Sequence, residues 1–392
     1  HGPTSAFKDV ALCMLPQLMT AAKTLKGMQE NILILTATSG DTGKAALEGF
    51  KDVEGIKICV FYPHGGVSKV QRAQMATQEG SNVTVLAVEG NFDDAQTGVK
   101  NIFATVGGSL TEGGARLSTA NSINIGRLAP QITYYFKAYA DLLKAGKISM
   151  GDPVNYCVPT GNFGDILAGY LAKKLGLPVG KLICASNANN VLTDFIHTGV
   201  YDRRRPLHKT ISPSMDILVS SNLERLLYHL SNNSSDEISA LMASLNVDKK
   251  YTVSENVLSA MREEFAAGCA DDTQVAETIR HIFDDTGYVC DTHTAVAMRV
   301  YEDYRTESGD DTPTVIASTA SPFKFAPAIL EALGGGDSDT PYEQLAELKQ
   351  KTGWEIPQPL GSLRDKEIRF TDVCDNDKPG MQSTVYRMLG LE

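Results

Sequence analysis

One strand-to-helix connection has the residue types and spacing of an anion-binding site. An apolar run at residues 154–158 is followed by PTGNFGD at 159–165 and then by a helix-compatible stretch at 166–175. Two glycines three residues apart let the backbone turn tightly and aim successive N–H groups at one position, and a helix start adds partial positive charge. The segment therefore predicts a phosphate cradle, with a purely structural turn as the alternative.

A second loop of the same kind follows the apolar run at residues 31–36. Residues 36–43 read TATSGDTG, and a helical pattern begins at Lys44. Four hydroxyl groups and two glycines at a helix start suit a carboxylate or a phosphate. A nucleotide P-loop is excluded, because that motif needs Gly at the position of Thr38 and Ser or Thr at the position of Ala45. The dinucleotide fingerprint G-x-G-x-x-G is absent from both loops.

A candidate catalytic lysine lies near the start of the sequence. Residues 1–9 read HGPTSAFKD, so that Lys8 stands between an aromatic and an acidic residue, ahead of an apolar helical stretch. A partly desolvated lysine can lose its proton near neutral pH and form a Schiff base. A surface lysine is the alternative on spacing alone. The hydroxyl cluster STAS at residues 318–321 is another candidate site segment, and loop capping is its alternative.

The elements that position these segments alternate between short β-branched runs and longer helical patterns. Strands are predicted at residues 31–36, 57–62, 83–88, 154–158, 182–185 and 313–317. Helices are predicted between them at residues 44–50, 69–79, 125–145 and 166–175. This alternation is typical of an α/β protein with mainly parallel sheets covered by helices.

Composition narrows the class of protein. The chain has 392 residues, with 36 Lys and Arg against 47 Asp and Glu, a formal net charge of −11. That balance argues against nucleic-acid or anionic-membrane partners. Its seven cysteines are odd in number and form no CxxC pair, so we expect a reduced, cytoplasmic setting and no metal site. We also expect a segment upstream of His1, since the first residues already belong to a candidate site.

Six segments in one order along the chain resemble the threonine synthase family. They are HGPTSAFKD at 1–9, TATSGDTG at 36–43, ANSINIGR at 120–127, PTGNFGD at 159–165, DTHTAVA at 291–297 and STASPFKF at 318–325. The similarity is to the longer bacterial and fungal type, which has an N-terminal region ahead of the lysine motif.

The resemblance implies a pyridoxal-phosphate enzyme of fold type II, with two parallel-sheet α/β domains and the cofactor between them. The smaller domain would span residues 28–145, and the larger one residues 1–27 and 146–392. The implied reaction converts O-phospho-L-homoserine and water to L-threonine and phosphate. We expect a monomer or a homodimer.

The resemblance also assigns roles to individual residues. Lys8 would carry the cofactor, Thr319 would face the pyridine nitrogen, and Asn121 would lie near the cofactor ring. Arg127 is favoured over Lys69 and Arg72 as the cation for the substrate phosphate, because it belongs to the ANSINIGR segment. Two larger sets complete the implied site: the cofactor phosphate would be bound by Gly161, Asn162, Phe163, Gly164 and Asp165, and the substrate by Ser39, Gly40, Asp41, Thr42 and Asn124.

The last segment departs from the family pattern. The family usually has TAHPAKF, whereas this chain has Ser321 in place of the histidine and Phe323 in place of the alanine. Any role of that histidine is therefore in question. His293 in the DTHTAVA segment is the alternative imidazole, although a histidine before an apolar helix is commonly a capping or core residue.

Two other functions are compatible with these residues. One is a phospho-lyase that eliminates phosphate from O-phosphohomoserine or phosphothreonine and releases 2-oxobutyrate. The other is an inactive homologue that binds the cofactor and serves a regulatory or scaffold role. Product analysis separates the first from a synthase.

Overall fold

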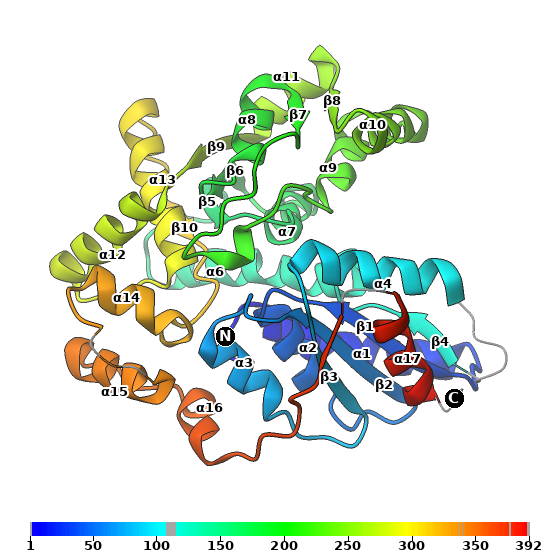
Figure 1. Cartoon of the computed structure of the whole chain (residues 1–392). Coiled ribbons are helices and arrows are strands. Elements are labelled where there is room, and N and C mark those ends of the chain that lie inside the picture. The colour runs from blue at the N-terminus through cyan, green and yellow to red at the C-terminus, as the bar shows by residue number, and fades with distance from the viewer. Residues whose placement is uncertain (1, 107–114, 337, 339, 376–377, 390–392) are drawn as a thin grey trace. The chain divides into compact units, whose positions relative to one another are not determined.

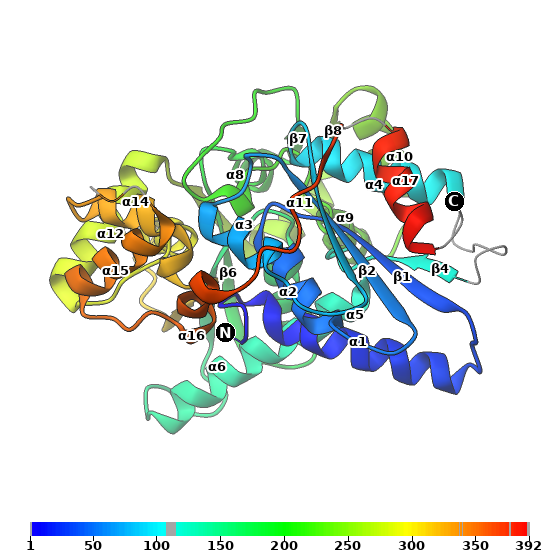
Figure 2. The same cartoon turned by 60° about the horizontal axis from the view of Figure 1, so that its bottom comes forward.

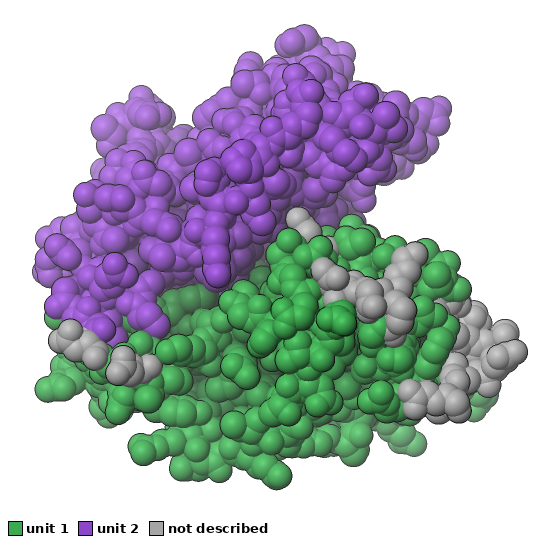
Figure 3. All heavy atoms as spheres, in the orientation of Figure 1, with its two compact units in different colours: residues 1–130, 323–326, 337–392 green, residues 131–322, 327–336 purple. Residues whose placement is uncertain are grey.

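The computed structural model describes residues 2–106, 115–336, 338, 340–375 and 378–389. The chain divides into two compact units, which Figure 3 colours separately. Unit 1 comprises His1–Pro130, Phe323–Ala326 and Asp337–Glu392, and unit 2 comprises Gln131–Pro322 and Pro327–Gly336. Among the described helices, none combines the length and the hydropathy that crossing a membrane requires. The domain bounds expected from the family resemblance stay a prediction.

Unit 1 is built on a five-stranded parallel sheet with the strand order β11-β3-β2-β1-β4 (Figure 1). Its strands are β1 (Asn31–Ala37), β2 (Ile56–Pro63), β3 (Val83–Val88), β4 (Ala115–Ser118) and β11 (Val373–Cys374). Figure 2 shows the strands with α1 (Lys8–Leu25) and α2 (Asp41–Phe50) on one side, and α4 (Phe92–Val106) and α17 (Lys378–Leu389) on the other.

Alternate residues of these strands face opposite sides, as the period of two in a strand requires. Ile32 and Ile34 of β1 join the core that includes Phe50 of α2, whereas Leu33 and Leu35 join the core that includes Val99 of α4. Burial on both faces explains the unbroken apolar runs of the sequence. The other helical segments with residues in unit 1 are α3 (Lys69–Ala76), α5 (Ile125–Leu128), α15 (Pro341–Thr352), α16 (Gln358–Gly361) and the 3₁₀ turns η1 (Ala129–Gln131), η3 (Pro322–Phe325) and η4 (Ser362–Asp365).

Unit 2 contains a second parallel sheet, of strand order β10-β5-β6-β9. Neighbouring residues of β5 face opposite layers: the Cys157 thiol donates to the Ala297 carbonyl oxygen, and the Tyr156 hydroxyl donates to the Tyr135 carbonyl oxygen. Helix α13 (Thr292–Ser308) therefore covers one face, and α6 (Ile132–Lys144) contributes to the other. The strands are β5 (Val154–Pro159), β6 (Val179–Ser186), β9 (Phe265–Cys269) and β10 (Thr314–Ile316).

The remaining elements surround this second sheet. A separate antiparallel pair consists of β7 (Val200–Asp202) and β8 (Lys250–Thr252). The other helical segments are α7 (Gly164–Lys174), α8 (Val191–Thr198), η2 (Pro213–Met215), α9 (Leu223–Leu230), α10 (Ser235–Val247), α11 (Glu255–Glu264), α12 (Asp272–Thr286) and α14 (Ala326–Ala332).

The expected α/β fold with parallel sheets is confirmed, and all six predicted strands are present. The prediction of one helix over residues 125–145 is wrong, because α5 and α6 are separated by a 3₁₀ turn that contains Pro130. Proline lacks the N–H group that would continue the α-helical ladder. The helix predicted at 69–79 ends at Ala76.

Candidate active site

The predicted phosphate cradle lies in unit 2, at the carboxyl end of β5. Helix α7 begins at Gly164, and Phe163 before it has a φ of 59° and makes no side-chain cap. The first N–H groups of a helix have no acceptor within that helix, and its N-terminus carries partial positive charge. This turn therefore has the donors that a phosphate needs.

The carbonyl groups of the cradle are held by neighbouring side chains. The Ser220 hydroxyl donates to the Gly161 carbonyl at 2.7 Å, and the Asn222 amide donates to the Asn162 carbonyl at 2.8 Å. Bonds that fix carbonyl oxygens in this way also fix which direction the N–H groups of the same turn face. Sequence reasoning missed Ser220 and Asn222, although the Ser-Ser-Asn run just before α9 is a polar cluster of the kind that bonds to backbone.

Glycine is required at position 161. A Cβ atom there would lie 2.9 Å from the Ser214 carbonyl oxygen and 3.3 Å from the Met215 Cα, both of which are backbone atoms. The cradle is thus closely packed against the turn at residues 213–215. This close approach suits a backbone-lined anion site and agrees with the expected cofactor phosphate.

His293 fixes that neighbouring turn. The Ser214 N–H donates to His293 Nε2 at 3.2 Å, and His293 Nδ1 lies 2.9 Å from Asp291 Oδ1. Because Nε2 accepts, Nδ1 carries the proton and donates it to the carboxylate. His293 is 3% exposed. The interpretation of this residue as a buried, supporting histidine therefore agrees with its contacts.

Thr319 follows β10, the strand paired with β5, and is 7% exposed. Its N–H donates to the Thr294 hydroxyl at 3.4 Å. Loops that leave neighbouring parallel strands emerge at the same edge of a sheet, where α/β proteins bind ligands. Unit 2 thus places an anion cradle and a buried threonine at one sheet edge, which is the donor set expected for the phosphate and the pyridine nitrogen of pyridoxal phosphate.

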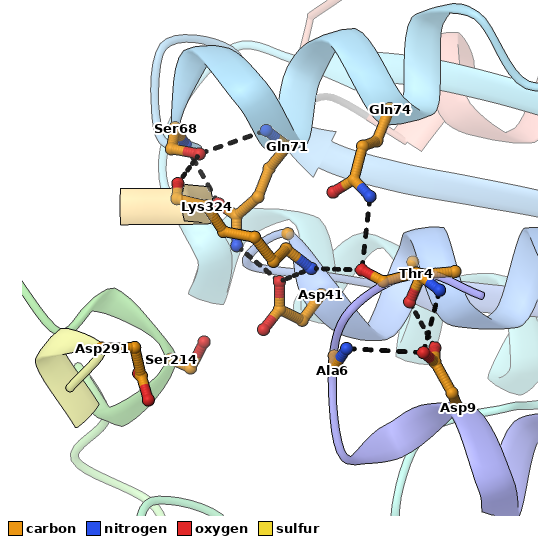
Figure 4. A network of polar contacts seen from close by, with 12 residues as sticks. Thr4, Ala6, Asp9, Asp41, Ser68, Gln71, Gln74, Ser214, Asp291 and Lys324 are labelled. Carbon is orange, nitrogen blue, oxygen red and sulfur yellow. Dashed lines mark hydrogen bonds and ion pairs between the residues drawn. The ribbon is translucent and has the colours of Figure 1, made fainter. Parts of the chain in front are cut away.

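Lys8 lies in unit 1 as the first residue of α1, with its ammonium 4.5 Å from the centre of the Phe7 ring. It is partly buried, whereas Asp9 is 1% exposed. Asp9 accepts the Thr4 N–H at 2.8 Å and the Ala6 N–H at 3.4 Å, and also bonds to the Thr4 hydroxyl (Figure 4). Asp9 therefore fixes the turn that leads into Lys8. His1, the first residue of this segment, lies outside the described residues.

The TATSGDTG loop is also in unit 1, where it connects β1 to α2. The Thr38 hydroxyl accepts the Gly40 N–H at 2.9 Å and the Gly43 N–H at 2.8 Å. Gly40 has a φ of 132°, and a Cβ there would lie 2.3 Å from the Gln71 side chain. The residues assigned to the substrate carboxylate thus lie in a fixed turn at a helix start, which favours an anion.

A buried ion pair supports this loop. Lys324 Nζ lies 2.6 Å from Asp41 Oδ1, and Gln71 Nε2 donates to the same oxygen at 2.8 Å. Burial raises the pKa of the Asp41 carboxyl, but the charges of Lys324 and Lys8 and these hydrogen bonds together lower it below its ordinary value. Asp41 is therefore ionised at neutral pH. Sequence reasoning missed Lys324, although it belongs to the STASPFKF segment.

The ANSINIGR segment is bonded to both ends of the same loop. Asn121 donates to the Ala37 carbonyl oxygen at 2.9 Å, and Arg127 donates to the Ala120 carbonyl at 3.0 Å and the Thr42 hydroxyl at 3.3 Å. The Asn124 side chain caps α5.

Arg127 is 5% exposed, whereas Lys69 is exposed at the start of α3. Unit 1 therefore contains Lys8, the substrate loop, the two asparagines and the three candidate cations, and unit 2 contains the cradle and Thr319. The ligand roles of these residues stay predictions.

Two family models match the chain. A model described as "Pyridoxal-phosphate dependent enzyme" matches residues 1–320, and one described as "Threonine synthase, C-terminal" matches residues 294–385. Together they cover nearly all of the sequence and include all six segments compared above.

Individual known proteins that resemble the chain belong to the same family as the matching models. The chain is 43% identical over 342 residues to "Threonine synthase-like 1" of Homo sapiens, with 85% of this chain and 45% of that protein covered. It is 41% identical over 354 residues to threonine synthase of Pseudomonas aeruginosa, with 90% and 72% covered. The chain thus spans about half the length of the threonine synthase-like 1 relatives it matches.

A solved structure extends the similarity to the fold. The crystal structure of threonine synthase from Brucella melitensis, described as bound to PLP, has a TM-score of 0.84 and 37% identity to this chain. The match covers 99% of this chain and 77% of that one. The cradle and Thr319 therefore belong to a fold that binds pyridoxal phosphate in a related protein.

Proposed function

Because the chain belongs to the threonine synthase family of pyridoxal-phosphate-dependent enzymes, we propose that it converts O-phospho-L-homoserine and water to L-threonine and phosphate. The observation that supports this proposal is the set of intact site segments: the lysine, the carboxylate loop and the phosphate cradle lie at the starts of α1, α2 and α7. We further propose that the enzyme has fold type II and acts in the cytoplasm. Its acidic net charge argues against a nucleic-acid or anionic-membrane partner.

Lys8 is the proposed attachment point of the cofactor and the proposed general base. When bound, pyridoxal phosphate supplies an electron sink that stabilises negative charge next to the substrate amino group. The reaction removes protons from Cα and Cβ, breaks the Cγ–O bond to phosphate, adds a water oxygen to Cβ and returns protons to Cα and Cγ. An amine on a flexible four-carbon side chain can serve several of these carbon atoms.

The loop at Ser39–Thr42 is proposed to bind the substrate carboxylate. It lies at the N-terminus of α2, where N–H groups lack acceptors within the helix. Asp41 in this loop is ionised, and the Lys324 ammonium offsets its charge. The loop can therefore bind an anion although it contains an acidic residue.

The substrate phosphate requires a cation, and Arg127 and Lys69 are the proposed ligands. Arg127 already bonds to Thr42, so its guanidinium is next to the substrate loop. Lys69 is exposed at the start of α3, and its neighbour Ser68 caps that helix. Charge-assisted bonds from such groups are the strong contacts that a phosphate makes in proteins.

Product analysis tests the proposal. Purified protein loaded with pyridoxal phosphate is incubated with O-phospho-L-homoserine, and threonine, phosphate and 2-oxobutyrate are quantified. We expect threonine and phosphate in equal amounts, and no turnover by Lys8→Ala. Release of 2-oxobutyrate as the main product would instead show a phospho-lyase, and cofactor binding without turnover would show an inactive homologue.

A further inference from the structure

A fully buried lysine joins two segments of unit 1 that carry proposed active-site residues. Lys324 is 0% exposed, lies 2.6 Å from Asp41 Oδ1 and donates to the Thr4 carbonyl oxygen at 3.1 Å (Figure 4). Lysine is almost never fully buried without a partner, because desolvating its charge is costly. A hydrophobic residue would fill such a position at lower cost, so the ammonium itself needs an explanation.

One end of this contact is the substrate loop. Asp41 is the first residue of α2, and its side chain is 3% exposed. The Gln71 side-chain amide donates from Nε2 to the same carboxylate oxygen, and its Oε1 accepts the Ser68 N–H at 3.0 Å. The Ser68 hydroxyl in turn donates to the Lys324 carbonyl at 3.1 Å. The Asp41 carboxylate is thus held in one position by a closed ring of contacts.

The other end is the turn that leads into Lys8. The Thr4 carbonyl accepts from Lys324 and from Gln74, and the Thr4 N–H and hydroxyl donate to Asp9 (Figure 4). Asp9 is adjacent to Lys8 in sequence. A chain of direct contacts therefore runs from Asp41 through Lys324 and Thr4 to the start of α1.

We propose that Lys324 is a positioning residue: its ammonium neutralises Asp41 and ties the Ser39–Thr42 loop to the turn that precedes Lys8. The inference rests on the proposed function, since it assigns the loop to the substrate carboxylate and Lys8 to the cofactor. Without Lys324, the buried Asp41 charge repels an incoming carboxylate. Loss of the Lys324 ammonium also leaves Lys8 as a cation whose charge acts on Asp41. Because the Asp41 carboxylate then lacks the charge of Lys324, it favours the ammonium form of Lys8 over the reactive amine.

Lys324→Met tests the proposal, because methionine keeps an unbranched side chain without the charge. Lys44→Met is the matched control: Lys44 is 7% exposed and its Nζ lies 2.9 Å from Glu48 Oε2, so it forms a partly buried ion pair, but its side chain bonds to Glu48 and Gln78 rather than to the loop or the turn. Each variant loses one ion pair, and urea unfolding of the cofactor-free proteins reports the stability loss of each.

Two functional readouts separate positioning from stability. For Lys324→Met we expect KM for O-phospho-L-homoserine to rise about 30-fold or more, with a smaller fall in kcat, since a like charge near the carboxylate acts mainly on binding. We also expect cofactor attachment to Lys8, trapped by borohydride after mixing, to slow about tenfold. Lys44→Met should leave both within twofold. Equal effects of the two variants, after correction for stability, would overturn the proposal.

A charge-free pair gives a second test, of whether the two charges are coupled. Asp41→Asn combined with Lys324→Met removes both charges and should recover KM at least tenfold relative to Lys324→Met alone, because the repulsion is gone. If the KM change of the double variant is simply the product of the changes caused by Asp41→Asn and by Lys324→Met, the two charges are not coupled and the proposal is overturned. If the natural protein binds cofactor but has no turnover, the proposed function fails, yet the trapping rate still decides whether Lys324 positions Lys8.

Discussion

The substitution Gly161→Ala tests whether the turn before α7 binds the cofactor phosphate. The added Cβ would lie 2.9 Å from the Ser214 carbonyl oxygen and 3.3 Å from the Met215 Cα. Ordinary contacts of a Cβ begin at 3.4 Å, so the two backbone segments must separate by about 0.5 Å. Neither neighbour is the end of a flexible side chain, and both segments are hydrogen-bonded elsewhere, so the turn cannot easily relax.

The size of the effect follows from this overlap. Forcing one methyl group into a closely packed site costs about 1–3 kcal/mol. If most of that strain displaces the N–H groups of the cradle, the dissociation constant for pyridoxal phosphate rises about 10- to 100-fold, since about 1.4 kcal/mol corresponds to a factor of ten. The turn has no catalytic group of its own, so we expect kcat at saturating cofactor to change less than the affinity.

Spectroscopic titration of the cofactor-free protein with pyridoxal phosphate measures this affinity. Gly361→Ala is the control, because the nearest atom to its added Cβ, in Ile356, is at 3.6 Å, an ordinary contact distance. Urea unfolding of both variants shows how much of the strain appears as lost stability. An affinity of Gly161→Ala within twofold of the natural protein, with its stability reduced, would refute the assignment of this turn to the phosphate.

Three other substitutions give measurable outcomes. Asp9→Ala leaves the buried Thr4 donors without their acceptor and should lower the free energy of unfolding by about 2–3 kcal/mol in urea denaturation; a loss below about 0.5 kcal/mol would contradict this role. The hydrogen bond to Glu302 raises the pKa of His281 above 6.5, so the pair stabilises the fold at lower pH and loses this effect as pH rises through the raised pKa. Nuclear magnetic resonance titration should show the His281 pKa returning toward 6.5 in Glu302→Gln, and no change would contradict the cause. Lys69→Met should raise KM for O-phospho-L-homoserine about tenfold with kcat unchanged; an unchanged KM would leave Arg127 as the phosphate ligand.

Much of the fold could be predicted because its strongest signals are local. Strands buried on both faces read as continuous apolar runs, and β3 has the predicted bounds of Val83–Val88. Short strands such as β4 and β11 give no such signal, since pairing with a neighbouring strand rather than local propensity defines them. The break between α5 and α6 was readable from Pro130, but the apolar spacing on both sides suggested one helix.

The candidate site also contains residues that could be predicted from the sequence and residues that could not. Gly161 and Lys8 are marked by residue type and spacing, and the resemblance to a family assigns their roles. Lys324, by contrast, has partners at Asp41 and Thr4, hundreds of positions earlier in the chain. Nothing in the local sequence distinguishes a buried lysine from an exposed one, because its burial depends on tertiary packing.

The most direct test of the account is the identity of the lysine that binds the cofactor. The protein is loaded with pyridoxal phosphate, reduced with borohydride, digested and mapped by mass spectrometry, with the visible absorbance recorded before and after reduction. We predict a single pyridoxyl group, on the peptide that contains Lys8, and its absence in Lys8→Ala. A label on Lys324 or on another lysine, or a loaded protein that acquires none, would contradict it.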